Sequence, residues 1–263
     1  MELFWQGWLP PVAPRGVLLL CHGLGEHSGR YGPVVEAVRP DGWGVYGLDH
    51  RGHGRSGGRR VHVRRYGDWL ADLDVLRRLA IGQHPGLPVF LLGHSMGGQL
   101  ALAYALDHQD DLRGLVLSAP ALAHSTVPRP VVTVLRALAR VVPTIRLVGI
   151  DESKISKDPA VYAAFQADPL VHHGKPTLGL SSALVGQFDV LPARARDLHL
   201  PVLLQYGTAD AIVDPVGFRR LERECRSPDV TVHAYDGLWH EIYNEPERDR
   251  PLADLREWLS AHT

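Results

Sequence analysis

Residues 89–98, Val-Phe-Leu-Leu-Gly-His-Ser-Met-Gly-Gly, decide how the rest of the chain is interpreted. The first four form an apolar run, and the apolar-periodic segment 99–104 follows the polar turn. A strand, a sharp turn and a helix in this order are the context of the G-x-S-x-G nucleophile elbow, in which the turn exposes a serine. The glycines around Ser95 allow the strand and the helix to approach closely. We therefore predict that Ser95 is a nucleophile; the alternative is an ordinary glycine-rich turn.

Composition is that of an ordinary globular protein. The 263 residues suit one sizeable domain, and 45% of them are hydrophobic. A formal net charge of −1 gives no basic footprint for nucleic acid. The N-terminal residues show no signal-peptide pattern, and no apolar run reaches the ~18 residues that a membrane span needs. We expect a cytoplasmic protein in which Cys21 and Cys225 are reduced.

Short apolar runs alternate along the chain with segments of helical periodicity. Because most of these runs are continuously apolar, we expect strands that are covered on both faces. The expected strands are 4–8, 17–21, 45–48, 89–92, 115–118, 202–206 and 230–235, and the expected helices between them are 34–38, 69–81, 96–105, 216–225 and 250–261. This alternation predicts an α/β domain with a mostly parallel central sheet and helices on both faces.

The alternation stops between residues 123 and 190, where helical patterns follow one another without a clear strand. The helices expected there are 131–142, 158–166 and 177–190. A helical insertion in an α/β sheet often covers the active site. We therefore expect residues 123–190 to form a helical cap, or lid, on a core made of 1–122 and 191–263.

A serine nucleophile needs a base and an acid that orients the base, and on the α/β-hydrolase scaffold they follow in the order serine, acid, histidine. Asp210 follows the strand 202–206, at the end of the sheet where sites collect. Asp214 is the competing acid, but it precedes Pro215 and a helical pattern, which is typical of a helix N-cap. We predict Asp210 as the acid.

The base must be one of the late histidines among the 15 in the chain. His240 lies in the loop after the strand 230–235. His233 lies within that strand, His199 precedes the strand of the acid, and His262 is at the end of the chain. We therefore predict His240 as the base.

The oxyanion of the tetrahedral intermediate requires two donors. The residue after the nucleophile supplies one, the N–H of Met96, and the loop after an early strand supplies the other. That loop reads His22-Gly23-Leu24-Gly25, so we assign the second donor to the N–H of Leu24. His22 could be mistaken for a second catalytic histidine, but a role in bracing the loop is the better interpretation.

The stretch 49–56, Asp-His-Arg-Gly-His-Gly-Arg-Ser, also follows an expected strand. It lacks the spacing and the lysine of a phosphate-binding loop, so we predict a structural turn beside the elbow and no nucleotide.

Four stretches together resemble the monoacylglycerol lipases, which are serine hydrolases. They are 22–31 (His-Gly-Leu-Gly-Glu-His-Ser-Gly-Arg-Tyr), 49–56, 93–98 and 240–247 (His-Glu-Ile-Tyr-Asn-Glu-Pro-Glu). Segments 155–159 and 168–171 also resemble the cap of the bacterial members. The resemblance implies an α/β-hydrolase fold with a Ser95–Asp210–His240 triad. It implies hydrolysis of monoacylglycerol to fatty acid and glycerol without a cofactor.

The resemblance also places Glu26 and Arg30 at the end of the site that accepts glycerol, although an ion pair that braces the loop is an equal alternative. The apolar segment 131–142 has two interpretations: it lines an acyl tunnel and docks on a membrane or micelle, with Arg136 and Arg140 near headgroups, or it is buried against the core. The oligomeric state is left open.

Two other functions fit the same residues. A broader carboxylesterase or lysophospholipase would use the same triad. A protein of a different class, a ligand-binding protein on the hydrolase fold, could keep the triad without turnover.

Overall fold

The computed structural model describes residues 1–123, 129–146 and 149–263. It contains a seven-stranded sheet in the order β1-β3-β2-β4-β5-β6-β7, in which only β1 is antiparallel to its neighbour. The strands are β1 (Trp5–Trp8), β2 (Gly16–Cys21), β3 (Trp43–Leu48), β4 (Val89–His94), β5 (Gly114–Ser118), β6 (Val202–Gly207) and β7 (Val230–Tyr235). The mostly parallel sheet expected from the sequence is confirmed, with strand ends within two residues of the expected ones.

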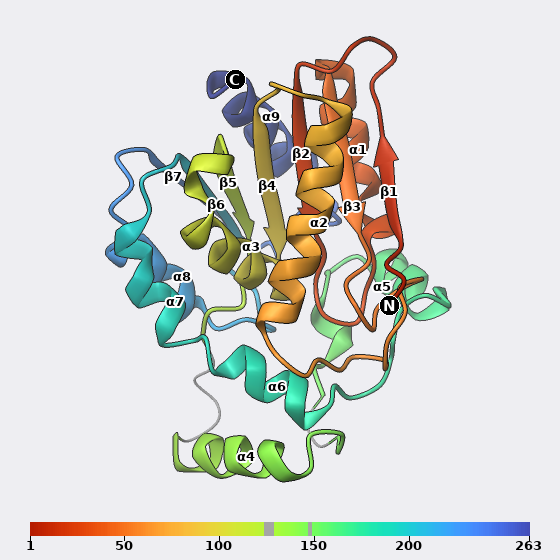
Figure 1. Ribbon diagram of the computed structural model, residues 1–263, viewed down its shortest axis with the longest axis vertical. Coiled ribbons are helices and arrows are strands. Elements are labelled where there is room, and N and C mark those ends of the chain that lie inside the picture. Colours follow the sequence, from red (N-terminus) through yellow and green to blue (C-terminus); the bar gives the residue numbers. More distant parts are fainter. Residues whose placement is uncertain (124–128, 147–148) are drawn as a thin grey trace.

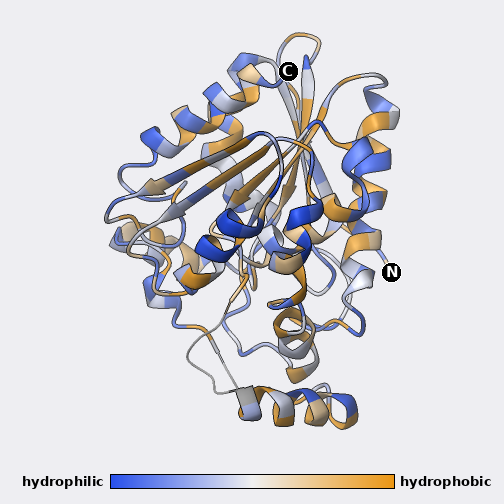
Figure 2. Cartoon of the chain, turned by 90° about the vertical axis from the view of Figure 1, so that its left-hand side faces the viewer, coloured by the Kyte–Doolittle hydropathy of each residue, from blue (hydrophilic) through white to orange (hydrophobic). Residues whose placement is uncertain are grey.

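Helices cover both faces of the sheet (Figure 1). They are α1 (Gly32–Val38), α2 (Gly67–Gln83), α3 (Met96–Asp107), α8 (Pro215–Glu224) and α9 (Asp249–Ala261). The side chains of β2 alternate between the two faces: Leu19 packs in a core with residues of α2, α3 and α8, whereas Leu18 and Leu20 pack with α1 and α9. Figure 2 shows the hydrophobic strands in the middle of the molecule, between helices of mixed character. Burial on both faces explains the continuously apolar strand sequences.

Between β5 and β6, the described part of the chain contains helices joined by loops and no strand of the sheet. It forms α4 (Arg129–Val141), α5 (Pro159–Ala167), α6 (Leu178–Val185) and α7 (Val190–Arg194). The single helix expected over 177–190 is wrong, because α6 stops before Gly186 and a separate short helix begins at Val190. Figure 1 shows α4 and α6 beyond the end of the sheet at which the parallel strands finish. This is the edge of a parallel α/β sheet where functional sites collect.

In the part of the chain that the structure describes, no helix combines the length and the apolar character needed to cross a bilayer.

Candidate active site

Ser95 lies at the junction of β4 and α3 in a strained backbone conformation, with φ 54° and ψ −118°. Positive φ in a non-glycine residue costs about 1–3 kcal/mol and is retained where the surrounding structure enforces it. Close packing enforces it here, because a Cβ at Gly93 would collide with the carbonyl of Gly97, and one at Gly97 with the carbonyl of Cys21. The sharp strand-to-helix turn expected from the sequence is present.

Asp210 and His240 come from the loops after β6 and β7, and they contact each other. Asp210 Oδ2 and His240 Nδ1 are 2.7 Å apart, and both side chains are buried. The other carboxylate oxygen accepts the N–H groups of Ile212 and Val213, at 2.8 and 3.1 Å. The carboxylate is therefore fixed in place. Because it engages Nδ1 of His240, the Nε2 atom is the one left for proton transfer.

Charge and burial act on this pair in opposite directions. Burial raises the pKa of Asp210, but the charge and hydrogen bond of His240 and the two backbone donors outweigh it, and the pKa lies below its usual value. Burial lowers the pKa of His240, but the Asp210 carboxylate together with Glu241 and Glu26 outweighs it, and the pKa lies above its usual value. Asp210 is therefore an anion that stabilises a protonated His240.

The competing residues have other roles. Asp214 accepts the N–H of Val216 at 2.9 Å and caps α8. His233 lies in β7 and stacks on Tyr235, His199 is exposed, and His262 follows α9.

His22 braces the loop after β2. Its Nε2 accepts the N–H of His50 at 2.8 Å, and its Nδ1 lies 2.8 Å from the Gly23 carbonyl, to which it donates in that tautomer. His50 belongs to the stretch 49–56, which therefore packs on this loop. Both ring nitrogens of His22 are occupied within the protein.

Leu24 and Met96, the residues assigned as oxyanion donors, both line a cavity together with Ser95. Met96 is the first residue of α3, where a backbone N–H has no partner within the helix. Leu24 follows Gly23, whose N–H donates to Glu26 at 2.5 Å. The loop conformation at Leu24 is therefore tied to a buried carboxylate.

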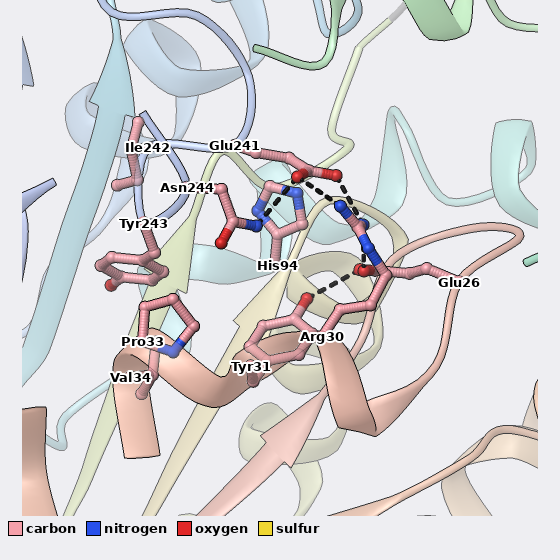
Figure 3. Close-up of a pocket in the computed structure, with 10 residues that line it drawn as sticks. All are labelled: Glu26, Arg30, Tyr31, Pro33, Val34, His94, Glu241, Ile242, Tyr243 and Asn244. Atoms are coloured by element: carbon pink, nitrogen blue, oxygen red, sulfur yellow. Dashed lines mark hydrogen bonds and ion pairs between the residues drawn. The ribbon is translucent and has the colours of Figure 1, made fainter. Parts of the chain in front are cut away.

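Glu26 and Arg30 form a buried ion pair, with Oε2 and Nη1 2.7 Å apart. The other oxygen of Glu26 accepts from the N–H of Gly23. It also accepts from the hydroxyl of Tyr31 (Figure 3). Although burial raises the pKa of Glu26, the charge of Arg30 leads the effects that lower it to about 2. The glutamate is therefore an anion that braces the loop, and it also borders the small pocket beside Ser95.

Glu241 is a member of this cluster that the sequence did not predict. Its two carboxylate oxygens each accept from Arg30 at 2.7 Å, a bidentate pair (Figure 3). Glu241 directly follows His240, but no spacing rule relates it to an arginine 211 residues away. Only the fold brings the two loops together.

Two pockets meet at Ser95. The larger has a volume of about 250 Å³, and Val132 and Leu135 of α4 and Leu180 and Leu184 of α6 contribute apolar walls. The smaller, of about 40 Å³, is lined by apolar residues such as Ile155 and Phe165 together with His240 and the charged residues Glu26, Arg30, Glu152 and Glu241. Among the described residues, no group of three or more histidines, cysteines and carboxylates is arranged to hold a metal ion.

A serine in a strained turn after β4, an acid after β6 and a histidine after β7 on a mostly parallel sheet define an α/β-hydrolase. The family model described as serine aminopeptidase, S33, matches residues 12–247.

The chain is 41% identical to the monoacylglycerol lipase of Mycolicibacterium smegmatis, over 100% of this chain and 94% of that protein. It is 32% identical to the monoglyceride lipase of Homo sapiens, over 99% of this chain and 88% of that protein. The crystal structure of Paleococcus ferrophilus monoacylglycerol lipase is similar with a TM-score of 0.91 at 35% identity, covering 100% of both chains. The chain belongs to the monoacylglycerol lipase family of serine hydrolases, as its motifs indicated.

Proposed function

We propose that this protein hydrolyses monoacylglycerol to a free fatty acid and glycerol. The observation that carries the proposal is the meeting of two unlike pockets at Ser95: one is apolar and suits an acyl chain, and the other is small and is bordered by charged as well as apolar side chains. An ester with one acyl chain and a small hydroxylated alcohol matches this division. The names of the relatives, monoacylglycerol lipase and monoglyceride lipase, support the same substrate.

In the proposed mechanism, the Ser95 hydroxyl attacks the ester carbonyl while His240 Nε2 accepts its proton. Asp210 holds the imidazole at Nδ1 and stabilises its protonated form. The N–H groups of Leu24 and Met96 bind the oxyanion, and loss of one such donor typically costs ~10²–10³ in rate. His240 then protonates the leaving glycerol, and water activated by His240 hydrolyses the acyl-enzyme.

We assign residues 123–190 to the cap and the walls of the acyl pocket to its helices. Val132 of α4 and Leu184 of α6 line the cavity that Ser95 also lines. Burying each methylene of an acyl chain there contributes about 0.8 kcal/mol. The cap therefore sets which acyl chains bind well.

At the glycerol end, the contacts support separate roles for the charged residues. The carboxylate of Glu26 is engaged by three donors, from Gly23, Arg30 and Tyr31, so we assign it to bracing the loop. Glu152 lines the same pocket and uses its Oε2 to accept from Gln166, at 2.9 Å. We assign the remaining carboxylate oxygen of Glu152 to a glycerol hydroxyl.

We further propose that α4 docks on membranes or micelles. Val131, Val134, Leu138 and Val141 are exposed and lie on one side of the helix, which has Arg136 and Arg140 elsewhere on its surface. An interfacial helix has this arrangement of an apolar side and cationic side chains. Docking there would bring lipid substrate to the cavity that α4 also lines.

The proposed function is tested by the release of fatty acid from 1-monoacylglycerols of graded length, a diacylglycerol, a lysophospholipid and p-nitrophenyl butyrate. Ser95→Ala is the control. We expect monoacylglycerols to be the preferred substrates and Ser95→Ala to be inactive. Turnover of only the short ester would indicate a general esterase, and preference for the lysophospholipid a lysophospholipase. Ligand binding without any turnover would indicate a binding protein.

A further inference from the structure

One arginine side chain links the loop that carries the oxyanion donor to the loop that carries the base. Arg30 Nη1 donates to Glu26 and to Glu241, and its Nη2 donates to Glu241, each at 2.7 Å. Arg30, Glu26 and Glu241 are all at least about nine-tenths buried as side chains, with exposures of 10%, 6% and 7%. Buried charged hydrogen bonds of this kind hold their partners in fixed positions.

At each end of this connection, the residue that is held lies next to a residue with a proposed role in the reaction. Glu26 holds the N–H of Gly23, and the next residue is Leu24. Glu241 follows His240 directly, and Figure 3 shows its carboxylate turned to the guanidinium of Arg30. The proposed oxyanion donor and the proposed base are therefore fixed relative to each other through Glu26, Arg30 and Glu241.

Glu241 has two further contacts that keep it in place. Asn244 Nδ2 donates to Oε2 of Glu241 at 2.9 Å, and the backbone N–H of Glu241 donates to the carbonyl of Ile155 at 2.8 Å. Ile155 belongs to the segment that joins α4 to α5, and Arg30 also lies over the ring of Phe165 in α5, 4.6 Å from its centre. The same pair of residues thus anchors the cap against the two loops.

We propose that Glu241 is a positioning residue for His240: by its bidentate pair with Arg30 it holds the loop of the base against the oxyanion loop and supplies a second negative charge beside the imidazole. This inference rests on the proposed function, because it assigns Glu241 to the same reaction. It is distinct from the role of Asp210, which contacts His240 itself.

The charges around His240 set its pKa, and a merely structural role of Glu241 would leave that pKa unchanged. The groups that face it are Asp210, the cluster of Glu26, Arg30 and Glu241, and the neighbouring ring of His94, 4.7 Å away between centres. Burial lowers the pKa of His240; Asp210, then Glu241 and Glu26, raise it. Removal of the Glu241 charge therefore lowers the pKa of His240. Because the base must be neutral to accept a proton, the acid limb of kcat/KM moves to lower pH.

The test is Glu241→Gln, which keeps the size of the side chain and removes its charge. We expect kcat/KM to fall roughly 10- to 100-fold as the loops lose their alignment. We expect the acid limb to move down by about 0.5–1 pH unit. Glu241→Asp keeps the charge on a shorter side chain. It should therefore lose activity, but the acid limb should shift less than in Glu241→Gln.

The matched control is Glu247→Gln, which removes the same charge from the same loop at a half-exposed position paired with Lys157. We expect that variant to leave both readouts unchanged. Thermal unfolding of each variant identifies losses that come from unfolding. The inference would be overturned if the acid limb of kcat/KM did not shift in Glu241→Gln. This holds whether the variant keeps its activity or loses activity together with stability.

The pKa of His240 should also be followed directly by NMR titration of labelled imidazoles, assigned with His240→Ala. This measurement needs no turnover, so it separates failure of the inference from failure of the proposed function. A lower pKa in Glu241→Gln supports the electrostatic part of the inference even if the protein hydrolyses a different ester. An unchanged pKa contradicts it even if the protein is a monoacylglycerol lipase.

Discussion

Replacing two exposed valines of α4 with serine should separate docking on lipid from chemistry. Val134 is 65% exposed and Val141 is 78% exposed. Full burial of a valine side chain contributes about 1.5–3 kcal/mol, so burial of these exposed fractions in a membrane surface contributes about 2–4 kcal/mol for the pair. Because 1.4 kcal/mol corresponds to a factor of ten, the Val134→Ser/Val141→Ser variant should bind lipid about 30- to 1,000-fold more weakly.

Co-sedimentation with phospholipid vesicles measures this loss directly. In parallel, initial rates should be compared on micellar monooleoylglycerol and on soluble p-nitrophenyl butyrate. We expect a large loss on the micellar substrate and a change of less than about twofold on the soluble one, because neither valine lines the cavity at Ser95.

The chain offers a matched control in Val75→Ser/Val216→Ser. These valines are 53% and 49% exposed but lie on α2 and α8. The control should bind vesicles as the unchanged protein does. An equal loss of activity on both substrates, or unchanged binding to vesicles in the α4 variant, would refute the docking of α4.

Three further predictions concern the elbow, the acyl pocket and the buried carboxylate. Ser95→Gly should abolish turnover yet raise the free energy of unfolding by about 1–3 kcal/mol, because glycine relieves the positive φ; unchanged or lower stability in denaturant titrations would contradict the strain. Leu184→Trp should shift the preferred acyl length to shorter chains in a chain-length series, and an unshifted profile would place the acyl chain elsewhere. The pKa of Glu26 is about 2 in the folded protein, below its usual value of 4.5, so its contribution to stability is present above about pH 4.5 and is lost as the pH falls toward 2. The stability of Glu26→Gln should therefore depend less on pH between these values, and parallel pH profiles for the two proteins would contradict this.

The elements of the core could be predicted because local pattern and tertiary packing agree. The inner strands β2 to β6 are covered on both faces, so nearly every position in them is apolar, and the runs are visible in the sequence. The choice of Asp210 over Asp214 followed from the same logic, because a proline and a helical pattern after an aspartate indicate a cap. The structure gives Asp214 that capping role and places Asp210 against His240.

The proposed cap was less predictable, because the ends of its helices are set by packing as well as by the local sequence. The segment 177–190 was expected to be one helix, and the sequence alone did not show that the helix stops before Gly186. Val132 of α4 lines the cavity, as the acyl-tunnel interpretation of 131–142 expects, whereas Val134 and Val141 are exposed rather than buried against the core.

The cluster around Arg30 shows the other limit. The ion pair of Glu26 and Arg30 spans four residues and was among the alternatives taken from the sequence. Glu241 was missed because its partner is distant in the chain and is brought near only when β2 and β7 are placed in one sheet. Pairings of this kind depend on tertiary structure, and no local pattern reports them.

The central claim is that Ser95 receives the acyl group of a monoacylglycerol. The most direct measurement is rapid-quench mass spectrometry of the protein mixed with 1-monooleoylglycerol, followed by peptide mapping of any adduct. The account predicts a transient oleoyl ester on the peptide that contains Ser95, and none in Ser95→Ala. An adduct on another residue, or release of fatty acid by Ser95→Ala at the rate of the unchanged protein, would contradict it.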